Sequence, residues 1–148
     1  MRLIRPLSAA LLAGLMMACT SNAQPTPPMT KMMSARLIGT SEVPPVSSTG
    51  TGMLEATVNT QTMVLSYTLS YAGLSGAVTA GHFHGPAATG VNAGVALPLN
   101  GNLSSPIKGE TTLTAAELAA LMAGNWYVNL HTSAHPAGEI RGQVTVKP

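Results

Sequence analysis

Two adjacent stretches of the chain alternate between apolar and polar residues, and this pattern constrains the fold more than any other feature. Residues 52–58 and 63–71 place apolar side chains at nearly every second position, and the polar turn 59–61 separates them. Side chains on a β-strand point alternately to opposite faces, so each stretch predicts a strand with one buried face. Two such strands joined by a short polar turn predict a β-hairpin.

Shorter apolar segments punctuated by Gly, Pro and Asn predict the remaining elements. Thr114-Ala115-Ala116-Glu117 has the form of a helix capping box, and Gly124 suits the end of a helix near residues 115–123. The expected fold class is all-β, an antiparallel Greek-key-like β-sandwich with one short helix that closes one end. The further strands are predicted at residues 35–39, 78–84, 94–97, 126–131 and 140–146.

The first residues predict export from the cytoplasm. A short basic segment precedes an apolar stretch, residues 7–18, which as a helix would rise only about 18 Å, too little to cross a hydrocarbon core about 30 Å thick. Residues 1–18 are therefore interpreted as a signal peptide. Cys19 follows directly, resembles the lipidated cysteine of a bacterial lipobox and is the expected lipid attachment point. Ordinary cleavage after Ala23 is the alternative.

Two further segments follow the signal. Residues 19–33 are rich in Pro, Thr and Ser and are expected to form a flexible tether, whereas residues 34–148 are expected to form one β-domain. This organisation predicts a lipoprotein of the bacterial cell envelope, attached to the membrane through Cys19. It would lie at the periplasmic face of the outer membrane or at the cell surface.

The charge balance argues against a nucleic-acid partner. The chain has 7 Lys and Arg residues and 5 acidic residues, all of them Glu. Arg2 and Arg5 belong to the predicted signal, so the rest of the chain carries 5 basic and 5 acidic groups. A nucleic-acid role therefore loses its support. The absence of Asp also excludes EF-hand calcium loops and Walker-type magnesium sites.

The histidines carry the distinctive chemistry of the chain, because all four lie in two short segments, residues 82–84 and 131–135. Residues two apart on a strand share a face with Cα atoms about 6.5–7 Å apart, so the His-x-His pair can direct two imidazoles at one ion. The second segment adds His131 on a predicted strand and His135 in the turn that follows it. A metal site is therefore predicted, with His82, His84, His131 and His135 as ligands.

The available ligand types narrow the choice of metal. The predicted β-domain contains no Cys and no Asp, so the site would consist of imidazoles alone. Such a site suits copper or zinc, and copper(II) has the highest affinity of the divalent series. Copper is the expected cofactor and zinc the second candidate, because structural zinc sites usually include Cys.

Several of these motifs together resemble the CHRD domain, the repeat named after chordin. The resemblance covers about residues 35–146 and implies a β-sandwich module that occurs singly in bacterial secreted proteins. It implies no particular activity. The matching segments are Glu42-Val43-Pro44-Pro45-Val46, Gly81-His82-Phe83-His84-Gly85-Pro86-Ala87, Tyr127-Val128-Asn129-Leu130-His131-Thr132 and Pro136-Ala137-Gly138-Glu139-Ile140-Arg141-Gly142-Gln143.

The His-x-His strand is also similar to the copper-binding strand of copper-zinc superoxide dismutase. This chain lacks the aspartate of that enzyme's zinc site and its disulfide, so a complete dismutase is not expected. A relative of this enzyme that binds only copper is the alternative. If the protein is an enzyme, this resemblance implies a copper-dependent oxidoreductase of the dismutase kind.

Four residues of the same motifs are candidates for supporting the metal site. Glu139 and Arg141 lie two apart on a predicted strand and are expected to form an ion pair, with a substrate or metal-supporting role as the alternative. Asn129 is expected to hydrogen-bond the backbone of residues 82–83 or a neighbouring loop, with substrate binding as the alternative. Tyr127 shares the face of His131 and is expected to pack there, with a redox role as the alternative.

Two functions of different classes follow from these observations. The first is an envelope-anchored copper protein that serves copper holding, delivery, electron transfer or superoxide chemistry. The second is a metal-free module that binds another envelope protein or a matrix polymer, in which the histidines are structural. Metal binding distinguishes the two functions.

Overall fold

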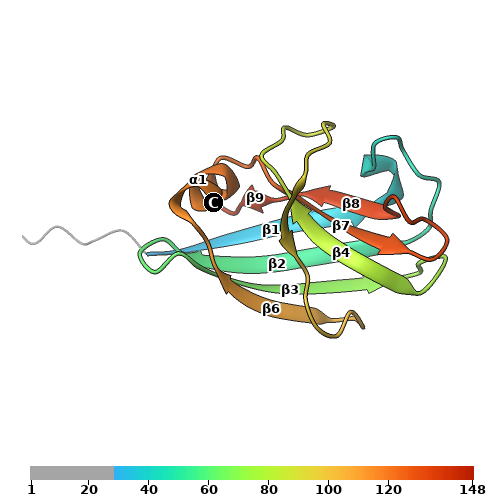
Figure 1. The fold of residues 1–148 in the computed structure, drawn as a ribbon, viewed down its shortest axis with the longest axis horizontal. Coiled ribbons are helices and arrows are strands. Elements are labelled where there is room, and N and C mark those ends of the chain that lie inside the picture. Colours follow the sequence, from blue (N-terminus) through green and yellow to red (C-terminus); the bar gives the residue numbers. More distant parts are fainter. Residues whose placement is uncertain (1–28) are drawn as a thin grey trace, which may run out of the picture.

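The computed structural model describes residues 29–148, so the predicted signal peptide and Cys19 lie outside the described residues. This part of the chain forms nine strands, a 3₁₀ turn η1 (Gly39–Ser41) and one α-helix, α1 (Ala115–Met122) (Figure 1). The strands are β1 (Thr30–Ile38), β2 (Thr51–Asn59), β3 (Val64–Ala72), β4 (Val78–His84), β5 (Val95–Pro98), β6 (Ile107–Thr112), β7 (Tyr127–Thr132), β8 (Ile140–Gln143) and β9 (Thr145–Val146).

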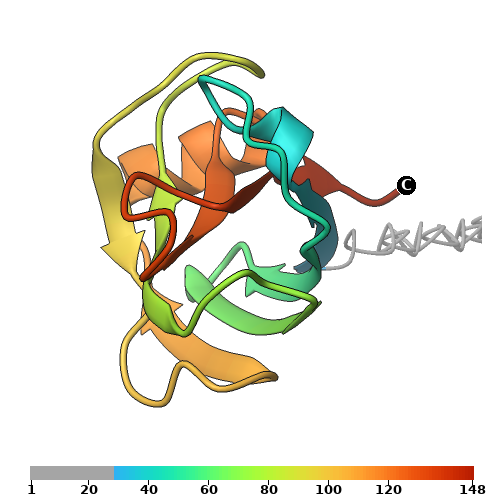
Figure 2. The same cartoon turned by 90° about the vertical axis from the view of Figure 1, so that its right-hand side faces the viewer.

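The strands form one antiparallel sheet that curls round the core, in place of the two sheets of the predicted sandwich. The order is β5-β4-β7-β8-β1-β2-β3-β6, and β9 pairs with β1. The cause is β1, which pairs with β2 along its whole length and also with β8 at Ile38 and with β9 at Met33 and Ser34. This strand joins the two halves of the fold, and Figure 2 shows the resulting curl. The predicted antiparallel all-β class with one short helix is confirmed.

The predicted hairpin consists of β2 and β3, which pair without a shift of register. Asn59 shapes the turn between them, because its Oδ1 accepts hydrogen bonds from the backbone N–H groups of residues 61 and 62 at 2.9 and 3.0 Å. Buried and more exposed positions alternate along both strands, as the period of two predicts.

The hydrophobic core lies inside the curl, between the two halves of the sheet. The ring of Tyr67 on β3 meets the ring of Phe83 on β4 edge to face with centroids 5.3 Å apart, although these strands are not hydrogen-bonded neighbours. Phe83 is fully buried and also lies 5.9 Å from Trp126. Buried area and aromatic geometry of this kind stabilise the curl. The core also contains Leu37, Leu54, Val58, Leu65, Leu69, Val128, Leu130 and Ile140.

Helix α1 begins at the predicted capping box. The backbone N–H of Glu117 donates to Thr114 Oγ1 at 3.3 Å, and the Thr114 backbone N–H donates to the Glu117 carboxylate at 2.7 Å. The helix is followed by Gly124, whose φ of +73° is left-handed and therefore favours glycine. Leu121 is buried, and α1 lies at the end of the molecule where the C-terminus also lies (Figure 1).

The segment 140–146, predicted as one strand, forms β8 and β9, and two further features of the sheet differ from the sequence prediction. Strand β1 begins at Thr30, inside the range expected for the tether, and Met33 is already part of the core. Strand β6 is not predicted, because its Lys108-Gly109-Glu110 segment is polar and weak in strand propensity. It forms at the edge of the sheet through its pairing with β3, which is a contact with a distant part of the chain.

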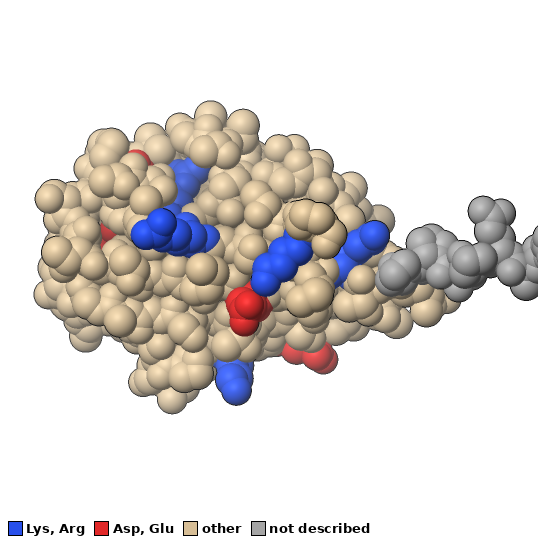
Figure 3. Space-filling model, turned by 180° about the vertical axis from the view of Figure 1, so that it is seen from behind, with Lys and Arg blue, Asp and Glu red and all other residues tan. Residues whose placement is uncertain are grey.

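The surface carries few charges. Figure 3 shows one face of the molecule, on which basic and acidic side chains are scattered among uncharged residues. Among residues 29–148, the one ion pair joins Lys147 Nζ to Glu55 Oε1 at 3.3 Å. No helix in this described part of the chain is long and apolar enough to cross a membrane.

Candidate metal centre

Two paired strands carry the side chains of the candidate site. Strands β4 and β7 are antiparallel, with His82 opposite Asn129 and His84 opposite Tyr127. Phe83 lies between the two histidines and points into the core. Because side chains alternate along a strand, the histidines on either side of Phe83 point to the opposite, outer face of the sheet.

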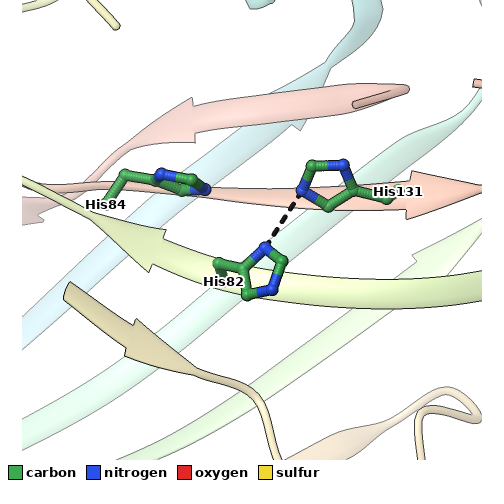
Figure 4. Close-up of side chains that lie close together, drawn as sticks. All are labelled: His82, His84 and His131. Atoms are coloured by element: carbon green, nitrogen blue, oxygen red, sulfur yellow. Dashed lines mark hydrogen bonds between the residues drawn. The ribbon is translucent and has the colours of Figure 1, made fainter. Parts of the chain in front are cut away.

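The imidazoles of His82, His84 and His131 converge on this outer face (Figure 4). One ring nitrogen from each histidine lies within 4.8 Å of the other two. His82 Nδ1 and His131 Nε2 are 3.1 Å apart. Nitrogen ligands bound at about 2 Å to one tetrahedral ion are about 3.3 Å apart, so the His82–His131 pair has the spacing of two ligands and the three-histidine cluster could hold a metal ion.

His135, the fourth predicted ligand, does not belong to this cluster. It lies in the turn after β7, where its backbone N–H donates to Thr132 Oγ1 and its carbonyl accepts from the Gly138 backbone N–H, both at 3.1 Å. The alternation of a strand no longer directs a side chain beyond the end of that strand. Three of the four predicted ligands are therefore brought together.

Two backbone carbonyls determine which nitrogen of two histidines carries the proton. His84 Nδ1 lies 3.0 Å from the Ala93 carbonyl oxygen, and His131 Nδ1 lies 2.9 Å from the Pro136 carbonyl oxygen. A carbonyl oxygen can only accept, so each Nδ1 donates a hydrogen to it. In the neutral imidazole, Nε2 then holds a lone pair, which is the form that binds a metal ion.

The side chain of Asn129 lies between these two Nε2 atoms. Its Oδ1 is 3.1 Å from His84 Nε2 and 3.1 Å from His131 Nε2. Its Nδ2 donates to Glu42 Oε1 at 3.4 Å. The predicted contact with a neighbouring loop is therefore made through Glu42. The sequence does not predict that the amide oxygen faces the histidines.

Burial favours the neutral form of two of the histidines. It lowers the pKa of His82, and the charges of His131 and His84 lower this pKa further. Burial also lowers the pKa of His84, although the contacts of this ring with Ala93 and Asn129 act in the opposite direction. Neutral imidazoles are the form that binds a metal ion, so the burial of these two histidines favours that form.

Glu42 is a buried acid beside the site, and the sequence does not predict it as a site residue. Burial raises the pKa of Glu42, whereas its hydrogen bond with Asn129 and the charge of Arg141 lower it. Gly138 leaves room for this contact, because a Cβ at that position would lie 2.5 Å from Glu42 Oε1 and 2.9 Å from Asn129 Nδ2. The sequence feature that could have identified Glu42 is that it is the one acidic residue of the motif 42–46.

Tyr127 and Arg141 stack beside His84. The rings of His84 and Tyr127 are parallel within 4°, with centroids 4.7 Å apart. The Arg141 guanidinium carbon lies 3.4 Å from the centroid of the Tyr127 ring, which is a cation–π contact. Arg141 also donates to Asn92 Oδ1 at 2.8 Å and to the Val91 carbonyl at 2.7 Å. Tyr127 thus packs on the histidine face, as the sequence predicts.

Glu139 does not pair with Arg141, so the predicted ion pair is wrong for the described chain. Glu139 precedes β8, and its carboxylate accepts from Ser48 Oγ at 2.7 Å and Thr132 Oγ1 at 2.6 Å. It also accepts from the backbone N–H and the hydroxyl of Ser75 at 2.8 and 2.9 Å. Burial raises the pKa of Glu139, but these hydrogen bonds together outweigh burial and lower it to about 2.

The comparison with known families identifies one match. Residues 33–144 match the family model of the CHRD domain. This range contains the three clustered histidines, Asn129 and Glu42. No curated protein and no solved structure matches the chain.

Proposed function

The chain belongs to the CHRD family, and from this premise and the histidine cluster we propose that its domain binds one transition-metal ion through His82, His84 and His131. Copper is the preferred ion and zinc the alternative. The domain would hold or deliver the ion, or use it in electron transfer or superoxide chemistry.

The observation that carries this proposal is the convergence of lone pairs on the outer face of the sheet. The Nε2 atoms of His84 and His131 both face Asn129 Oδ1 at 3.1 Å, and in the neutral imidazoles neither nitrogen has a hydrogen for this contact. Acceptors that face one another repel, and of these atoms only His131 Nε2 has a donor beside it, His82 Nδ1 at 3.1 Å. A cation bound among these atoms removes the repulsion and satisfies them together.

The chemistry of the ligands supports copper or zinc. Imidazole nitrogen binds both ions well, and copper(II) binds most tightly among the divalent first-row metals. Within residues 29–148 the cluster contains neither a thiolate nor a carboxylate. Hard ions such as calcium and magnesium take oxygen ligands, so they are disfavoured here.

Titration of the purified full chain with Cu²⁺ and with Zn²⁺ tests the proposal. After chelator treatment, we expect one ion to bind per chain, measured by calorimetry or by competition with a coloured chelator. His82→Ala, His84→Ala and His131→Ala should each lower the affinity by at least about tenfold, because the loss of a residue that only hydrogen-bonds a ligand already costs metal sites that much. A wild-type chain that binds neither ion at a 1:1 ratio contradicts the proposal.

The matched control for these variants is His135→Ala. This histidine belongs to the same motif but lies outside the cluster, so the variant should keep the wild-type affinity. A loss as large as that of the cluster variants would restore the four-histidine site expected from the sequence. The paramagnetic resonance spectrum of the copper-loaded chain reports the nitrogen ligands independently.

A metal-free binding module is the second candidate function, and the burial of Glu42 and Asn129 beside the histidines favours it. If the Asn129 amide turns by half a rotation, its two N–H groups can donate to the two Nε2 lone pairs. Its oxygen then faces Glu42 and can accept a hydrogen bond from the protonated form of this residue, which burial favours by raising the pKa of Glu42. Melting temperatures separate the functions. If the metal function is correct, one equivalent of Cu²⁺ raises the melting temperature of the wild type but not that of His131→Ala. If the histidines are structural, Cu²⁺ raises the melting temperature of neither protein.

We also propose that the protein is an exported lipoprotein of the bacterial envelope, attached through Cys19. The support is the apolar stretch 7–18 with this cysteine directly after it. Expression with labelled palmitate in a Gram-negative host tests it. The wild type should carry the label and fractionate with membranes, whereas Cys19→Ala should do neither. Equal labelling of the two proteins contradicts the proposal.

A further inference from the structure

We infer that Asn129 is a fourth ligand of the bound metal ion and coordinates it through its side-chain oxygen. This inference rests on the proposed function, because it assigns another coordination position of the same site. His135, which the sequence suggests for that position, lies outside the cluster. Asn129 is buried, with 4% of its surface exposed, and its amide lies on the same face as the three histidines.

The spacing of the donor atoms is that of a coordination sphere. Three separations of 3.1 Å connect four atoms in turn, from His82 Nδ1 to His131 Nε2, then to Asn129 Oδ1, then to His84 Nε2. Ligand atoms at about 2.0–2.1 Å from one ion are about 2.9 Å apart in a square arrangement and about 3.4 Å apart in a tetrahedral one. The carboxamide oxygen therefore already occupies the position of a neighbouring ligand.

Strand pairing places Asn129 directly opposite His82, which brings its amide to the histidines. The Glu42 carboxylate then directs the oxygen of the amide, rather than its nitrogen, toward them, because it accepts from Asn129 Nδ2 at 3.4 Å on the far side of the amide. An outer carboxylate of this kind fixes the orientation of a ligand and increases its basicity. Because residue 138 is a glycine, it places no Cβ against the Glu42 carboxylate and the Asn129 amide.

The proposed ligand set has consequences for the choice of ion. Three imidazoles and one neutral oxygen suit zinc and copper(II), whereas copper(I) prefers soft thiolate and thioether ligands. The oxygen ligand thus biases the site toward divalent ions. We expect Asn129→Leu, which removes the oxygen at similar size, to lower the Zn²⁺ affinity by at least about tenfold. Asn129→Asp retains an oxygen, although it loses the N–H that donates to Glu42, and should bind Zn²⁺ more tightly than Asn129→Leu.

A test on the unchanged protein uses Zn²⁺ alone, because this ion is diamagnetic and permits NMR. One equivalent of Zn²⁺ is added to the full chain labelled with ¹³C and ¹⁵N. We expect the side-chain carbonyl ¹³C resonance of Asn129 to shift together with the ring ¹⁵N resonances of the three histidines. The exposed Asn102 is the internal reference, because its Oδ1 accepts from the Ser104 backbone N–H and takes no part in the site.

The outcomes separate this inference from the proposed function. If the histidine resonances shift and the Asn129 carbonyl does not, the oxygen ligand is disproved and the three-histidine site stands. If no histidine resonance shifts on addition of Zn²⁺, both are disproved for this ion. An Asn129→Leu variant that is folded by circular dichroism and binds Zn²⁺ as tightly as the wild type also overturns the inference. If that variant does not fold, the wild-type spectrum decides.

Discussion

His84 and Tyr127 face each other across two paired strands, with ring planes 4° apart and centroids 4.7 Å apart. The stack fixes the plane of one candidate ligand without occupying either of its nitrogens. The same pair also shares one loop. The backbone N–H of Ala93 donates to the Tyr127 hydroxyl at 3.2 Å, and the Ala93 carbonyl lies 3.0 Å from His84 Nδ1. The tyrosine, the loop and the imidazole therefore hold one another in place.

Removal of the Tyr127 ring should destabilise the protein and weaken metal binding together. Tyr127→Leu abolishes the stack with His84 and the platform for Arg141, so we expect a loss of about 2–4 kcal/mol in the free energy of unfolding. Tyr127→Phe keeps the ring and loses only the hydroxyl contact, so about 1 kcal/mol is expected. Urea denaturation of the metal-free proteins measures both. Equal losses for the two variants would contradict a role for the ring.

A methyl group at Gly138 should damage the site specifically. In Gly138→Ala the new Cβ would lie 2.5 Å from Glu42 Oε1, and the φ of +129° is unfavourable for any side chain. The control is Gly101→Ala, because this glycine also has a positive φ of +86° but nothing within 4 Å of its Cβ position. Gly101→Ala should cost about 1–2 kcal/mol and leave Zn²⁺ affinity unchanged. Gly138→Ala should cost more and also lower that affinity, which a parallel titration of the two variants measures.

The buried carboxylate of Glu139 should make the protein sensitive to acid. Its folded pKa of about 2 lies below the value of 4.5 for the free side chain, so the unfolded chain binds more protons between these pH values. Stability is therefore full above about pH 5 and is lost as the pH falls toward 2. At 1.36 kcal/mol per pKa unit the contribution is at most about 3 kcal/mol.

Denaturation curves at several pH values check the role of Glu139. Glu139→Gln should be less stable than the wild type at pH 7 and should lose less stability on acidification. Ser48→Ala removes one of the donors to this carboxylate and should give an intermediate slope. A Glu139→Gln variant with the wild-type dependence on acid would disprove the assignment.

The histidine cluster should add a second pH dependence, at higher pH. Burial lowers the pKa values of His82 and His84 below 6.5 in the folded chain, so the unfolded chain takes up protons first as the pH falls. The metal-free protein should be most stable above pH 6.5 and lose stability below it. Melting temperatures in the presence of a chelator, from pH 8 to pH 5, measure the loss. The double variant His82→Gln, His84→Gln should show a shallower dependence.

Local patterns in the sequence predict the elements that position the site, because each of them depends on near neighbours in the chain. The period of two identifies the β2–β3 hairpin and strand β4 and places His131 on the face of Tyr127 and Asn129. The capping box at Thr114 identifies the start of α1. These signals arise from side-chain alternation and from hydrogen bonds within one turn of helix.

The parts that the sequence does not predict depend on contacts between distant segments. Glu42 reaches Asn129 across 87 positions of the chain, and Ser48 reaches Glu139 across 91. Strand β1 also pairs with strands of both halves of the sheet, including β8 and β9 from the far end of the chain. This pairing produces one curled sheet in place of the expected sandwich. His135 lies in the turn after β7, as predicted, and its position outside the cluster could not be predicted, because a turn has no periodicity that gives the direction of a side chain.

The register of β4 against β7 has a kinetic consequence. His82 and Asn129 are opposite each other on hydrogen-bonded strands, and His84 and His131 are held by backbone carbonyls. In the proposed site the donor atoms are thus in place before an ion arrives, and no segment has to fold around it. Capture of the ion should therefore follow a single second-order step, with a rate proportional to metal concentration and no slow conformational phase.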